Sequence, residues 1–318
     1  MAFGFSTTGD EIVDTFKDQV YGKTFLITGP TPGGIGAETA LSLTRANPKH
    51  LILAGRSQQK IQPLIDQISK ASPSVKISFV QLDLGSLQSV RNAAGEVKAI
   101  QAGDKIDVVI LNAAVMACPY SLTADGIESQ FGTNHLGHFL FGNLLLKEDL
   151  VRSRIVLVGS SASERKAEYA FAPLKDISYD HGKSYDPIQA YTFSKSCNNL
   201  YAKRLAKALK PNGITVLSLN PGSIATNLQG HMTAEVRSIA IEAAKKENPD
   251  FEIPERKTLQ QGASTQLRAA LDPSLEPESG AYLDHCQVKQ PAVHAGHGAF
   301  EDEVWEVSEQ LVGEQFAF

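Results

Sequence analysis

Tyr191 and Lys195 have the residue types and the spacing of a proton-transfer pair. They lie four residues apart in a stretch of helical character, 189–210, so both side chains are expected on one helix face. A lysine ammonium buried beside a tyrosine favours the phenolate and lowers the tyrosine pKa from about 10, which makes the phenol a usable acid and base near neutral pH. The pair is a weak indication by itself, because Tyr-x-x-x-Lys is a common pattern.

Two further polar residues strengthen the interpretation. Ser160 follows an apolar run, 154–159, that is typical of a strand, and Asn134 lies in a helix expected over 128–147. With Tyr191 and Lys195 they form four candidate catalytic residues. Ser161 is the alternative serine, and Ser160 is preferred because it is the residue directly after the strand.

A glycine-rich turn, Thr28-Gly-Pro-Thr-Pro-Gly-Gly-Ile-Gly36, follows the first predicted strand, 24–28, and precedes a helix expected over 37–45. Strand, turn and helix in this order are the context that a dinucleotide-binding fingerprint requires. Glycine permits the tight turn and lets backbone amides approach a pyrophosphate, and the helix N-terminus adds partial positive charge. The sequence therefore predicts a dinucleotide at this turn.

The residues after the second predicted strand, 51–54, indicate which dinucleotide binds. A carboxylate at this point would accept hydrogen bonds from the adenosine ribose of NAD and would repel a 2′-phosphate. None occurs between Leu51 and Lys60. Arg56 instead offers a planar fork for phosphate oxygens, with Lys60 one helical turn further on. We therefore predict NADP(H) rather than NAD(H).

Apolar runs and helical stretches alternate along the chain. Further strands are expected at 77–82, 108–112 and 214–219. These runs are apolar on both faces, which is typical of a parallel sheet covered by helices on both sides. The predicted fold class is α/β, with a single doubly wound parallel sheet of Rossmann type.

Residues 1–318 are predicted to form one NADP-binding domain, and four segments fall outside the alternation of strands and helices. A capping box at Thr8 begins an amphipathic helix within 8–21, and this helix and the C-terminal segment 284–318 are predicted to pack on the domain as additions. Segments 162–188 and 229–260 follow predicted strand ends and are candidates for the wall of the pocket.

Taken together, these motifs resemble the short-chain dehydrogenase/reductase family over nearly the whole chain, from about residue 23 to residue 282. Within that family, segments 115–120, 123–126 and 133–138 are similar to the retinol-dehydrogenase-like branch. The residues that carry the family resemblance are Thr28-Gly29, Gly34-Ile-Gly36, Leu82-Asp-Leu84, Asn112-Ala-Ala114, Asn134, Gly159-Ser160, Tyr191, Lys195, Asn220-Pro-Gly222 and Thr226.

The resemblance implies a role for each catalytic residue. Tyr191 would exchange a proton with the carbonyl or alcohol oxygen, and Ser160 would hydrogen-bond that oxygen. Lys195 would contact the nicotinamide ribose and tune Tyr191, while Asn134 would hold a water that links Lys195 to solvent. The implied cofactor-binding residues are Gly29, Thr31, Gly34, Ile35, Arg56, Asp83, Asn112, Lys195, Pro221, Gly222 and Thr226.

Asp83 would accept a hydrogen bond from the adenine amine, Asn112 would line the adenosine ribose, and Thr226 would lie by the nicotinamide amide. The turn departs from the family pattern, because four residues rather than three separate Gly29 from Gly34. The sequence thus leaves open which backbone amides hold the phosphates.

The activity implied by the resemblance is hydride transfer between NADPH and a carbonyl or alcohol group, as in a carbonyl reductase or an alcohol dehydrogenase. An apolar or aromatic small molecule is the expected substrate, because Met116, Tyr120, Tyr185 and Phe193 lie near motif positions. One alternative is a catalytically weak NADP-binding scaffold or sensor. A redox-assisted epimerase or dehydratase of nucleotide sugars is disfavoured by the glycine spacing and by the lack of a clear second domain.

Composition excludes several classes of protein. Thirty Lys and Arg against 35 Asp and Glu give a net charge of −5, so nucleic acid is not an expected partner. The apolar runs are far shorter than the roughly 18 residues of a membrane-spanning helix, and the acidic first 28 residues do not resemble a signal peptide. Cys118, Cys197 and Cys286 are too far apart for a disulfide framework, which favours a cytoplasmic location.

Two His-x-x-His patterns, His135 with His138 and His294 with His297, lack further ligands at suitable spacing, so no metal is predicted. A homo-oligomer is left open. Helices 128–147 and 189–210 correspond to those that pair in many oligomeric members of the family. They would be available for such pairing only if the N- and C-terminal additions do not cover them.

Overall fold

The structure is a computed structural model that describes residues 3–290 and 298–318. At its centre lies an eight-stranded sheet in which all neighbouring strands are parallel except the two at one edge, which form an antiparallel pair. This arrangement confirms the predicted α/β fold with a doubly wound sheet. In spatial order the strands are β10 (Gln287–Lys289), β9 (Tyr282–Asp284), β6 (Thr215–Asn220), β5 (Val151–Val158), β4 (Ile106–Leu111), β1 (Thr24–Thr28), β2 (His50–Gly55) and β3 (Lys76–Gln81).

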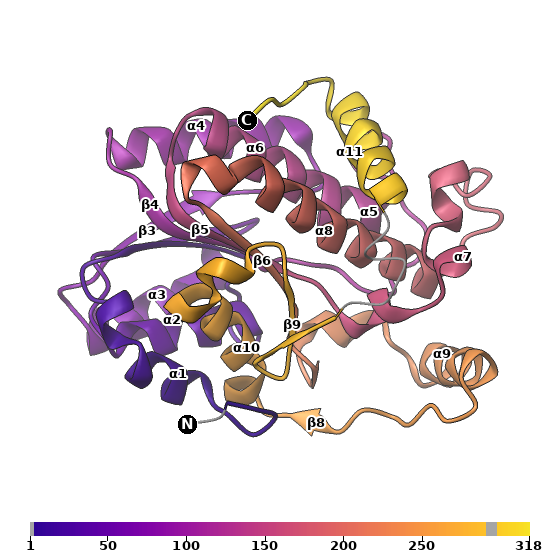
Figure 1. Cartoon of the computed structure of the whole chain (residues 1–318), viewed down its shortest axis with the longest axis horizontal. Coiled ribbons are helices and arrows are strands. Elements are labelled where there is room, and N and C mark those ends of the chain that lie inside the picture. The colour runs from indigo at the N-terminus through magenta and orange to yellow at the C-terminus, as the bar shows by residue number, and fades with distance from the viewer. Residues whose placement is uncertain (1–2, 291–297) are drawn as a thin grey trace.

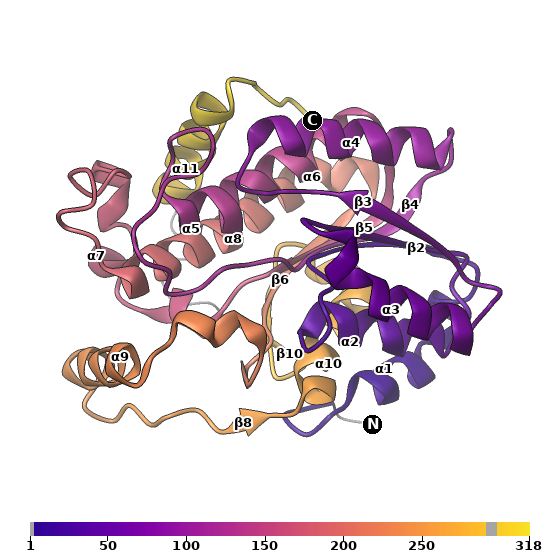
Figure 2. The ribbon, with the colours of Figure 1, turned by 180° about the vertical axis from the view of Figure 1, so that it is seen from behind.

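Helices cover both faces of the sheet, as the two opposite views show (Figures 1 and 2). Each helical layer encloses its own cluster of buried apolar side chains, one on either side of the strands. One layer holds α4 (Leu87–Gln101), α6 (Gly137–Lys147), α8 (Pro187–Leu209) and α11 (Gly298–Val312), and the other holds α1 (Gly9–Thr15), α2 (Ile35–Thr44), α3 (Gln58–Ala71) and α10 (Leu259–Leu271).

The central strand β1 shows why the strands are apolar throughout. All five of its residues are buried. Leu26 is in register with Ile52 of β2 and Val109 of β4, and it faces the α4/α6 layer, whereas Phe25 and Ile27 face the α2/α10 layer. A strand with helices on both sides needs apolar residues at consecutive positions rather than alternate ones.

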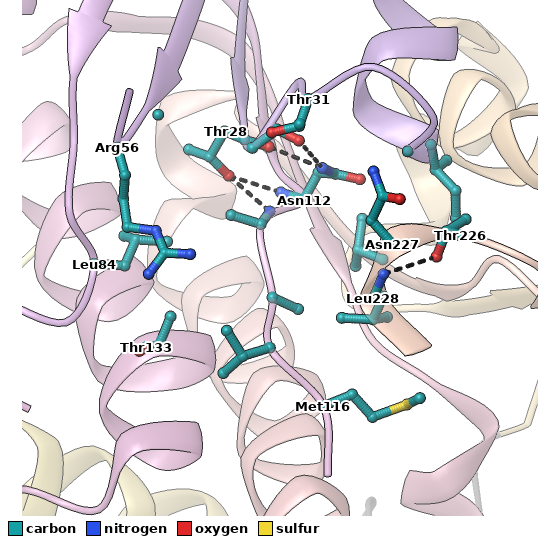
Figure 3. Close-up of a pocket in the computed structure, with 18 of the residues that line it drawn as sticks. Thr28, Thr31, Arg56, Leu84, Asn112, Met116, Thr133, Thr226, Asn227 and Leu228 are labelled. Carbon is teal, nitrogen blue, oxygen red and sulfur yellow. Dashed lines mark hydrogen bonds between the residues drawn. The ribbon is translucent and has the colours of Figure 1, made fainter. Parts of the chain in front are cut away.

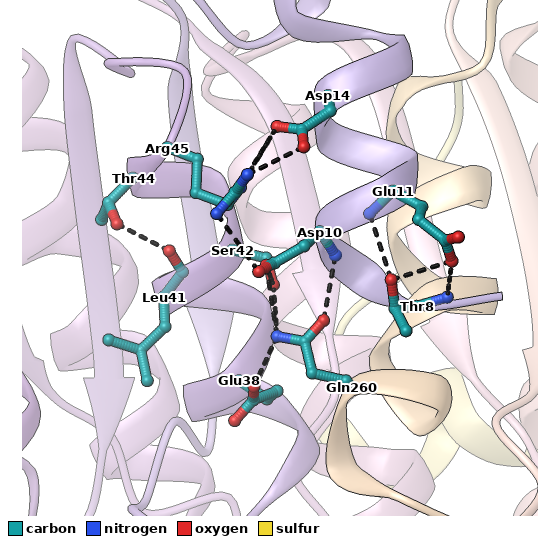
Figure 4. Close-up of polar contacts among 10 residues, drawn as sticks. All are labelled: Thr8, Asp10, Glu11, Asp14, Glu38, Leu41, Ser42, Thr44, Arg45 and Gln260. Carbon is teal, nitrogen blue, oxygen red and sulfur yellow. Dashed lines mark hydrogen bonds and ion pairs between the residues drawn. The ribbon is translucent and has the colours of Figure 1, made fainter.

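The N-terminal helix is shorter than the predicted range of 8–21. Thr8 and Glu11 form the expected capping box, but the backbone of Phe16 (φ −112°, ψ 32°) ends α1, and a 3₁₀ turn, Lys17–Gln19, follows. α1 lies between α2 and α10 (Figure 4). There the side-chain amide of Gln260 donates to Asp10 and Glu38, and its oxygen accepts from the Asp10 amide.

The prediction that 284–318 is wholly an addition is wrong for its first residues. Tyr282 of β9 pairs with Ser218 of β6, and β10 completes an antiparallel hairpin, so the segment through Lys289 belongs to the central sheet. Two three-residue strands are too short to show a readable periodicity. The terminal helix α11 does pack on α8, with Trp305 buried against Tyr201.

The segments 162–188 and 229–260 form the periphery. The first contains the 3₁₀ turn Ser161–Glu164 and α7 (Ala167–Ala170); the second contains α9 (Ala234–Glu247), which stands apart from the body in Figure 1 and has no buried residue. A bidentate ion pair between Arg165 and Glu247, at 2.8 and 3.1 Å, joins the two segments.

No helix in the described parts of the chain combines the length and the apolar content that crossing a membrane requires.

Candidate active site

A cavity of about 900 Å³ opens at the carboxyl ends of the parallel strands. β1 and β4 are neighbours there, and the chain leaves them toward opposite faces of the sheet, to α2 and to α6. Such a topological switch point is where ligands bind in open α/β sheets. The lining residues follow the ends of β1 to β6 (Figure 3).

The glycine-rich turn forms one wall of the cavity and leaves no room for side chains at two positions. Gly29 has φ +68°, and a Cβ added to it would lie 2.8 Å from the Cβ of Ala113. A Cβ on Gly36 would lie 2.5 Å from Nδ2 of Asn112. Gly34 is the N-cap of α2, so the free amides of a helix N-terminus are available beside the cavity.

The Thr28 hydroxyl joins the end of β4 to α6, and no pattern in the sequence indicates these contacts. Its hydroxyl oxygen accepts hydrogen bonds from the backbone amides of Asn112 and Ala113, at 2.9 and 3.0 Å (Figure 3). Nε2 of His138 lies 3.0 Å from the same oxygen, and burial lowers the His138 pKa to about 3. A neutral His138 therefore accepts the Thr28 proton at Nε2 and donates from Nδ1 to the carbonyl of Asn134.

Arg56 and Lys60 are exposed on the rim of the cavity. Within residues 3–290 and 298–318, neither of them forms an ion pair. Arg56 lies on the side of the cavity opposite Thr226 and Leu228 (Figure 3). Asp83 also lines the cavity, and its carboxylate accepts a hydrogen bond from the amide of Gly85. Among the described residues, Arg56 and Lys60 are thus two cations at the cavity without an ion-paired carboxylate.

Lys195 and Tyr191 project from α8 into the cavity. Lys195 is only 1% exposed, and its Nζ donates to the carbonyl of Val158 at 2.7 Å. Burial lowers the Lys195 pKa to about 7. The ammonium lies 5.9 Å from the centroid of the Tyr191 ring.

The expectation that Lys195 lowers the pKa of Tyr191 is not met in the structure. Burial raises the Tyr191 pKa to about 12, and hydrogen bonding to Ser160 acts in the opposite direction without outweighing it. Ser160 also accepts a hydrogen bond from the amide of Ala162, whereas Ser161 is exposed. Tyr191 is therefore protonated at neutral pH, and Ser160 rather than Ser161 is its partner.

Asn134 lies behind these residues in a π-helical turn, Gly132–Leu136, between α5 (Ser129–Phe131) and α6. Its side-chain oxygen accepts from the Val115 amide, and its nitrogen donates to the Val115 carbonyl and to Ser194. A π-helical turn at this point fits a functional position. The water that Asn134 was expected to hold stays a prediction.

The structure gathers most of the predicted cofactor-binding residues around the cavity and leaves one outside. Gly222 does not line it: its φ of +97° and its approach to the side chain of Lys257 give it a structural reason to be glycine. The predicted residues that do line it are Gly29, Thr31, Gly34, Ile35, Arg56, Asp83, Asn112, Lys195, Pro221 and Thr226.

Asn227 and Leu228 line the cavity although they were not predicted as site residues, and His231 lines it from within the predicted wall segment 229–260. They lie in a 3₁₀ turn, Asn227–His231, that Thr226 caps, and Nδ2 of Asn227 donates to the carbonyl of Pro32 in the glycine-rich turn. No local pattern in the sequence indicates this approach. Segment 162–188, a predicted pocket wall, contributes no residue to the cavity lining.

The first His-x-x-His pattern is part of the hydrogen-bonded interior. His135 has Asn198 at one ring nitrogen and Ser308 at the other, and burial lowers its pKa to about 4. Both nitrogens of His138 are also occupied, by Thr28 and the Asn134 carbonyl. His294 and His297 lie outside the described residues.

Known proteins are similar to this chain in sequence and in fold. A sequence profile of the short chain dehydrogenase family matches residues 23–172. Short-chain dehydrogenase TIC 32 A, a chloroplastic protein of Brassica napus, is 33% identical over 98% of this chain and 94% of its own length. Retinol dehydrogenase 11 of Homo sapiens is 35% identical over 95% of this chain and 89% of its own length.

Solved structures agree with these sequence relationships. An uncharacterised protein from Mycobacterium paratuberculosis is similar with a TM-score of 0.70 and 28% identity, covering 94% of this chain and 96% of that one. The NADPH-bound carbonyl reductase from chicken fatty liver has the same fold, with a TM-score of 0.59 and 20% identity, over 85% of this chain and 99% of that one. The chain belongs to the short-chain dehydrogenase/reductase family, in its retinol-dehydrogenase-like branch.

Proposed function

We propose that this chain is an NADP(H)-dependent oxidoreductase of the carbonyl reductase or alcohol dehydrogenase type. One observation carries the proposal: a single cavity has on one side a glycine-rich turn and two cations that form no ion pair within the described residues, and on another Tyr191 and Lys195. Ser160 does not line this cavity but is hydrogen-bonded to Tyr191. The first set suits a phosphorylated dinucleotide, and the second suits proton transfer to oxygen.

The geometry fits a nicotinamide cofactor in the cavity. A Cβ at Gly29 or Gly36 would collide with Ala113 or Asn112, so these two glycines let the turn pack closely against the end of β4, and Gly29 and Gly34 leave backbone exposed to the cavity. Arg56 and Lys60 would hold the 2′-phosphate that distinguishes NADP from NAD. When bound, the cofactor supplies the hydride.

The protein residues supply the proton and the orientation. Because burial keeps Tyr191 protonated, its hydroxyl can donate a proton to a carbonyl oxygen while Ser160 hydrogen-bonds the same oxygen. Lys195 is fixed by the Val158 carbonyl one helical turn from Tyr191. A substrate of apolar character is supported by Met116, Leu228 and Val115 in the lining.

Replacing Tyr191 by Phe removes the proposed acid and leaves the ring in place. We expect NADPH oxidation with an active ketone to fall by at least about 100-fold, while NADPH affinity measured by fluorescence titration changes by less than about twofold. Tyr201→Phe, which removes a hydroxyl from the same helix where it bonds Asn143, is the matched control.

Retained turnover in Tyr191→Phe would exclude the proposed acid. Absence of turnover by the unmodified chain across a wide panel of ketones and aldehydes, together with tight NADPH binding, would instead favour the alternative of an NADP-binding scaffold or sensor.

Arg56→Ala tests the cofactor assignment. Losing one charge-assisted hydrogen-bonding partner of a phosphate should weaken NADPH binding by roughly 10- to 100-fold, with NADH binding unchanged. Arg45→Ala, at an exposed arginine that pairs with Asp14, should change neither affinity. An unaltered ratio of the two affinities in Arg56→Ala would show that Arg56 does not select the cofactor.

We also propose a reducing compartment, the cytoplasm, because the three cysteines are free thiols and two of them are buried. A tagged chain that fractionates with chloroplasts or membranes would refute this location, and the chloroplastic relative makes that comparison worthwhile.

A further inference from the structure

Side chains rather than a neighbouring strand hold the segment 115–118, which follows β4 beside the cavity. Asn134 pairs with both the amide and the carbonyl of Val115, at 2.8 and 2.9 Å. Two residues further on, the amide of Ala117 donates to Oε1 of Gln130 at 2.9 Å. Between these two fixed points Met116 lines the cavity (Figure 3).

Ala117 has an unusual backbone conformation. It is buried and has φ +52°, in the left-handed region that residues other than glycine rarely adopt. Such a conformation persists where the surroundings over-determine it, and it occurs preferentially at functional sites. The Gln130 oxygen is the acceptor for the amide of this strained residue.

The other end of the Gln130 side chain reaches the catalytic helix. Its Nε2 donates to the carbonyl of Pro187 at 2.9 Å and to the hydroxyl of Tyr185 at 2.8 Å. Pro187 is the first residue of α8, and a helical carbonyl accepts from the amide four residues later, which here is that of Tyr191. One fully buried amide therefore bridges the pocket wall and the first turn of the helix that carries Tyr191.

The backbone of Gln130 is itself fixed. Glu128 caps α5, and its two carboxylate oxygens accept from the amides of Gln130 and Phe131 at 2.8 and 2.7 Å. The Tyr185 hydroxyl, which receives the Gln130 amide, lies 3.1 Å from Glu128 and 3.0 Å from the carbonyl of Cys118. Gln130 is thus anchored at its main chain and at both ends of its side chain.

We infer that Gln130 is a positioning residue that sets the distance between the Met116 wall and Tyr191. Its oxygen holds Ala117 in the left-handed conformation, and its nitrogen holds the first turn of α8. The inference rests on the proposed function only through the role of Tyr191; the linkage between the two segments belongs to the free chain.

Hydrogen exchange of the cofactor-free protein tests this linkage. In Gln130→Ala, amides in peptides spanning 113–119 and 187–193 should exchange at least about fivefold faster than in the unmodified chain. Gln130→Glu keeps an oxygen acceptor for Ala117 and loses both donors, so acceleration should be confined to 187–193. Gln266→Ala, which removes another buried amide, one that donates to Thr39, should accelerate neither peptide.

A double variant tests the role of Ala117. Glycine adopts φ +52° without strain, so adding Ala117→Gly to Gln130→Ala should slow exchange in the rest of peptide 113–119 relative to Gln130→Ala alone. The amide of residue 117, which has lost its acceptor, and peptide 187–193 should stay fast. Unchanged exchange at both peptides in Gln130→Ala, or in Gln130→Glu if the alanine variant does not fold, would overturn the inference.

Steady-state kinetics separates positioning from mere stability. Gln130→Glu should lower kcat for ketone reduction about tenfold, with the KM for NADPH unchanged, because the first turn of α8 with Tyr191 moves while the Met116 wall stays held. Gln130→Ala should in addition raise the KM for ketone, because it also releases the wall. Looser exchange with unaltered kinetics would overturn the positioning role while the proposed function stands. Absence of turnover by the unmodified chain would instead contradict the proposed function. The exchange data would still show whether Gln130 links segment 115–118 to the first turn of α8.

Discussion

At the scale of single residues, Lys195 carries a buried ammonium group, and burial of this charge destabilises the folded chain. Within the described residues its ammonium donates to the Val158 carbonyl alone, and burial lowers its pKa from 10.5 to about 7. A carbonyl does not replace the hydration that a charge loses on burial. A buried lysine of this kind is a candidate for a functional rather than a stabilising role, as proposed above for Lys195.

Lys195→Met should therefore stabilise the cofactor-free chain, and more so at low pH. Below pH 7 the folded chain carries the buried charge at full cost, whereas between pH 7 and 10.5 the folded lysine is neutral and the unfolded one is still charged, so the cost falls as pH rises. The advantage of Lys195→Met in the free energy of unfolding should shrink by about 2 to 3 kcal/mol from pH 6 to pH 9.

Urea unfolding at both pH values measures this difference, and Lys70→Met, on the exposed surface of α3, is the control that should show no such trend. If the difference in unfolding free energy between Lys195→Met and the unmodified chain grew toward pH 9, the Lys195 pKa would not be lowered in the folded chain.

The direction of the Tyr191 shift marks the limit of sequence reasoning at this scale. Spacing places Tyr191 and Lys195 on one helix face, and both do line the cavity. Their pKa values depend on how much water the fold removes and on a 5.9 Å separation, which no spacing specifies. Gln130 was missed for a related reason, because its partners lie 13 to 57 residues away in sequence.

At the scale of elements, α1 is held to the body by polar contacts around Gln260 of α10 (Figure 4). Its Nε2 lies within hydrogen-bond distance of Asp10, Glu38 and Ser42, which belong to α1 and α2. Three helices therefore share one side-chain amide. Buried apolar residues Ile12 and Val13 complete the contact.

Gln260→Ala should lower the free energy of unfolding by about 1 to 2 kcal/mol, because it leaves partly buried carboxylates of Asp10 and Glu38 without their shared donor. Chemical denaturation measures the loss, with Gln59→Ala on the exposed face of α3 as the control. Equal stability of the two variants would show that the contact is dispensable.

Elements with a strong period could be predicted, and short ones could not. The six strands from β1 to β6 are apolar runs and match the predicted ranges within a few residues. β9 and β10 have three residues each and depend on pairing with β6. In the N-terminal segment the four-residue spacing of Ile12, Phe16 and Val20 suggested one helix, yet Ile12 and Val20 are buried on either side of a turn.

At the scale of the whole molecule, α11 covers a face that the resemblance associates with oligomers. Trp305 packs on Phe139 of α6 and Tyr201 of α8, with ring centroids 5.0 and 6.0 Å apart, and Phe316 lies 5.8 Å from Phe139. The C-terminal residues thus occupy the outer surface of the two helices. The prediction of one domain over residues 1–318 stays a prediction.

We expect the full chain to be a monomer in light scattering after size exclusion. A chain lacking residues 298–318 should self-associate, because an aromatic surface around Phe139 and Tyr201 becomes exposed. A dimer of the full chain would show that α11 does not block pairing.

Because α9 stands apart from the body, little free energy is needed to detach it. Since none of its residues is buried and its described ion pair with the body is Arg165–Glu247, lifting this helix exposes little apolar surface and breaks few interactions. The free energy of that local opening is consequently a small fraction of the global unfolding free energy. We therefore expect α9 to detach locally while the sheet stays folded, and dissolved salt, by screening the Arg165–Glu247 ion pair, to make this opening more frequent.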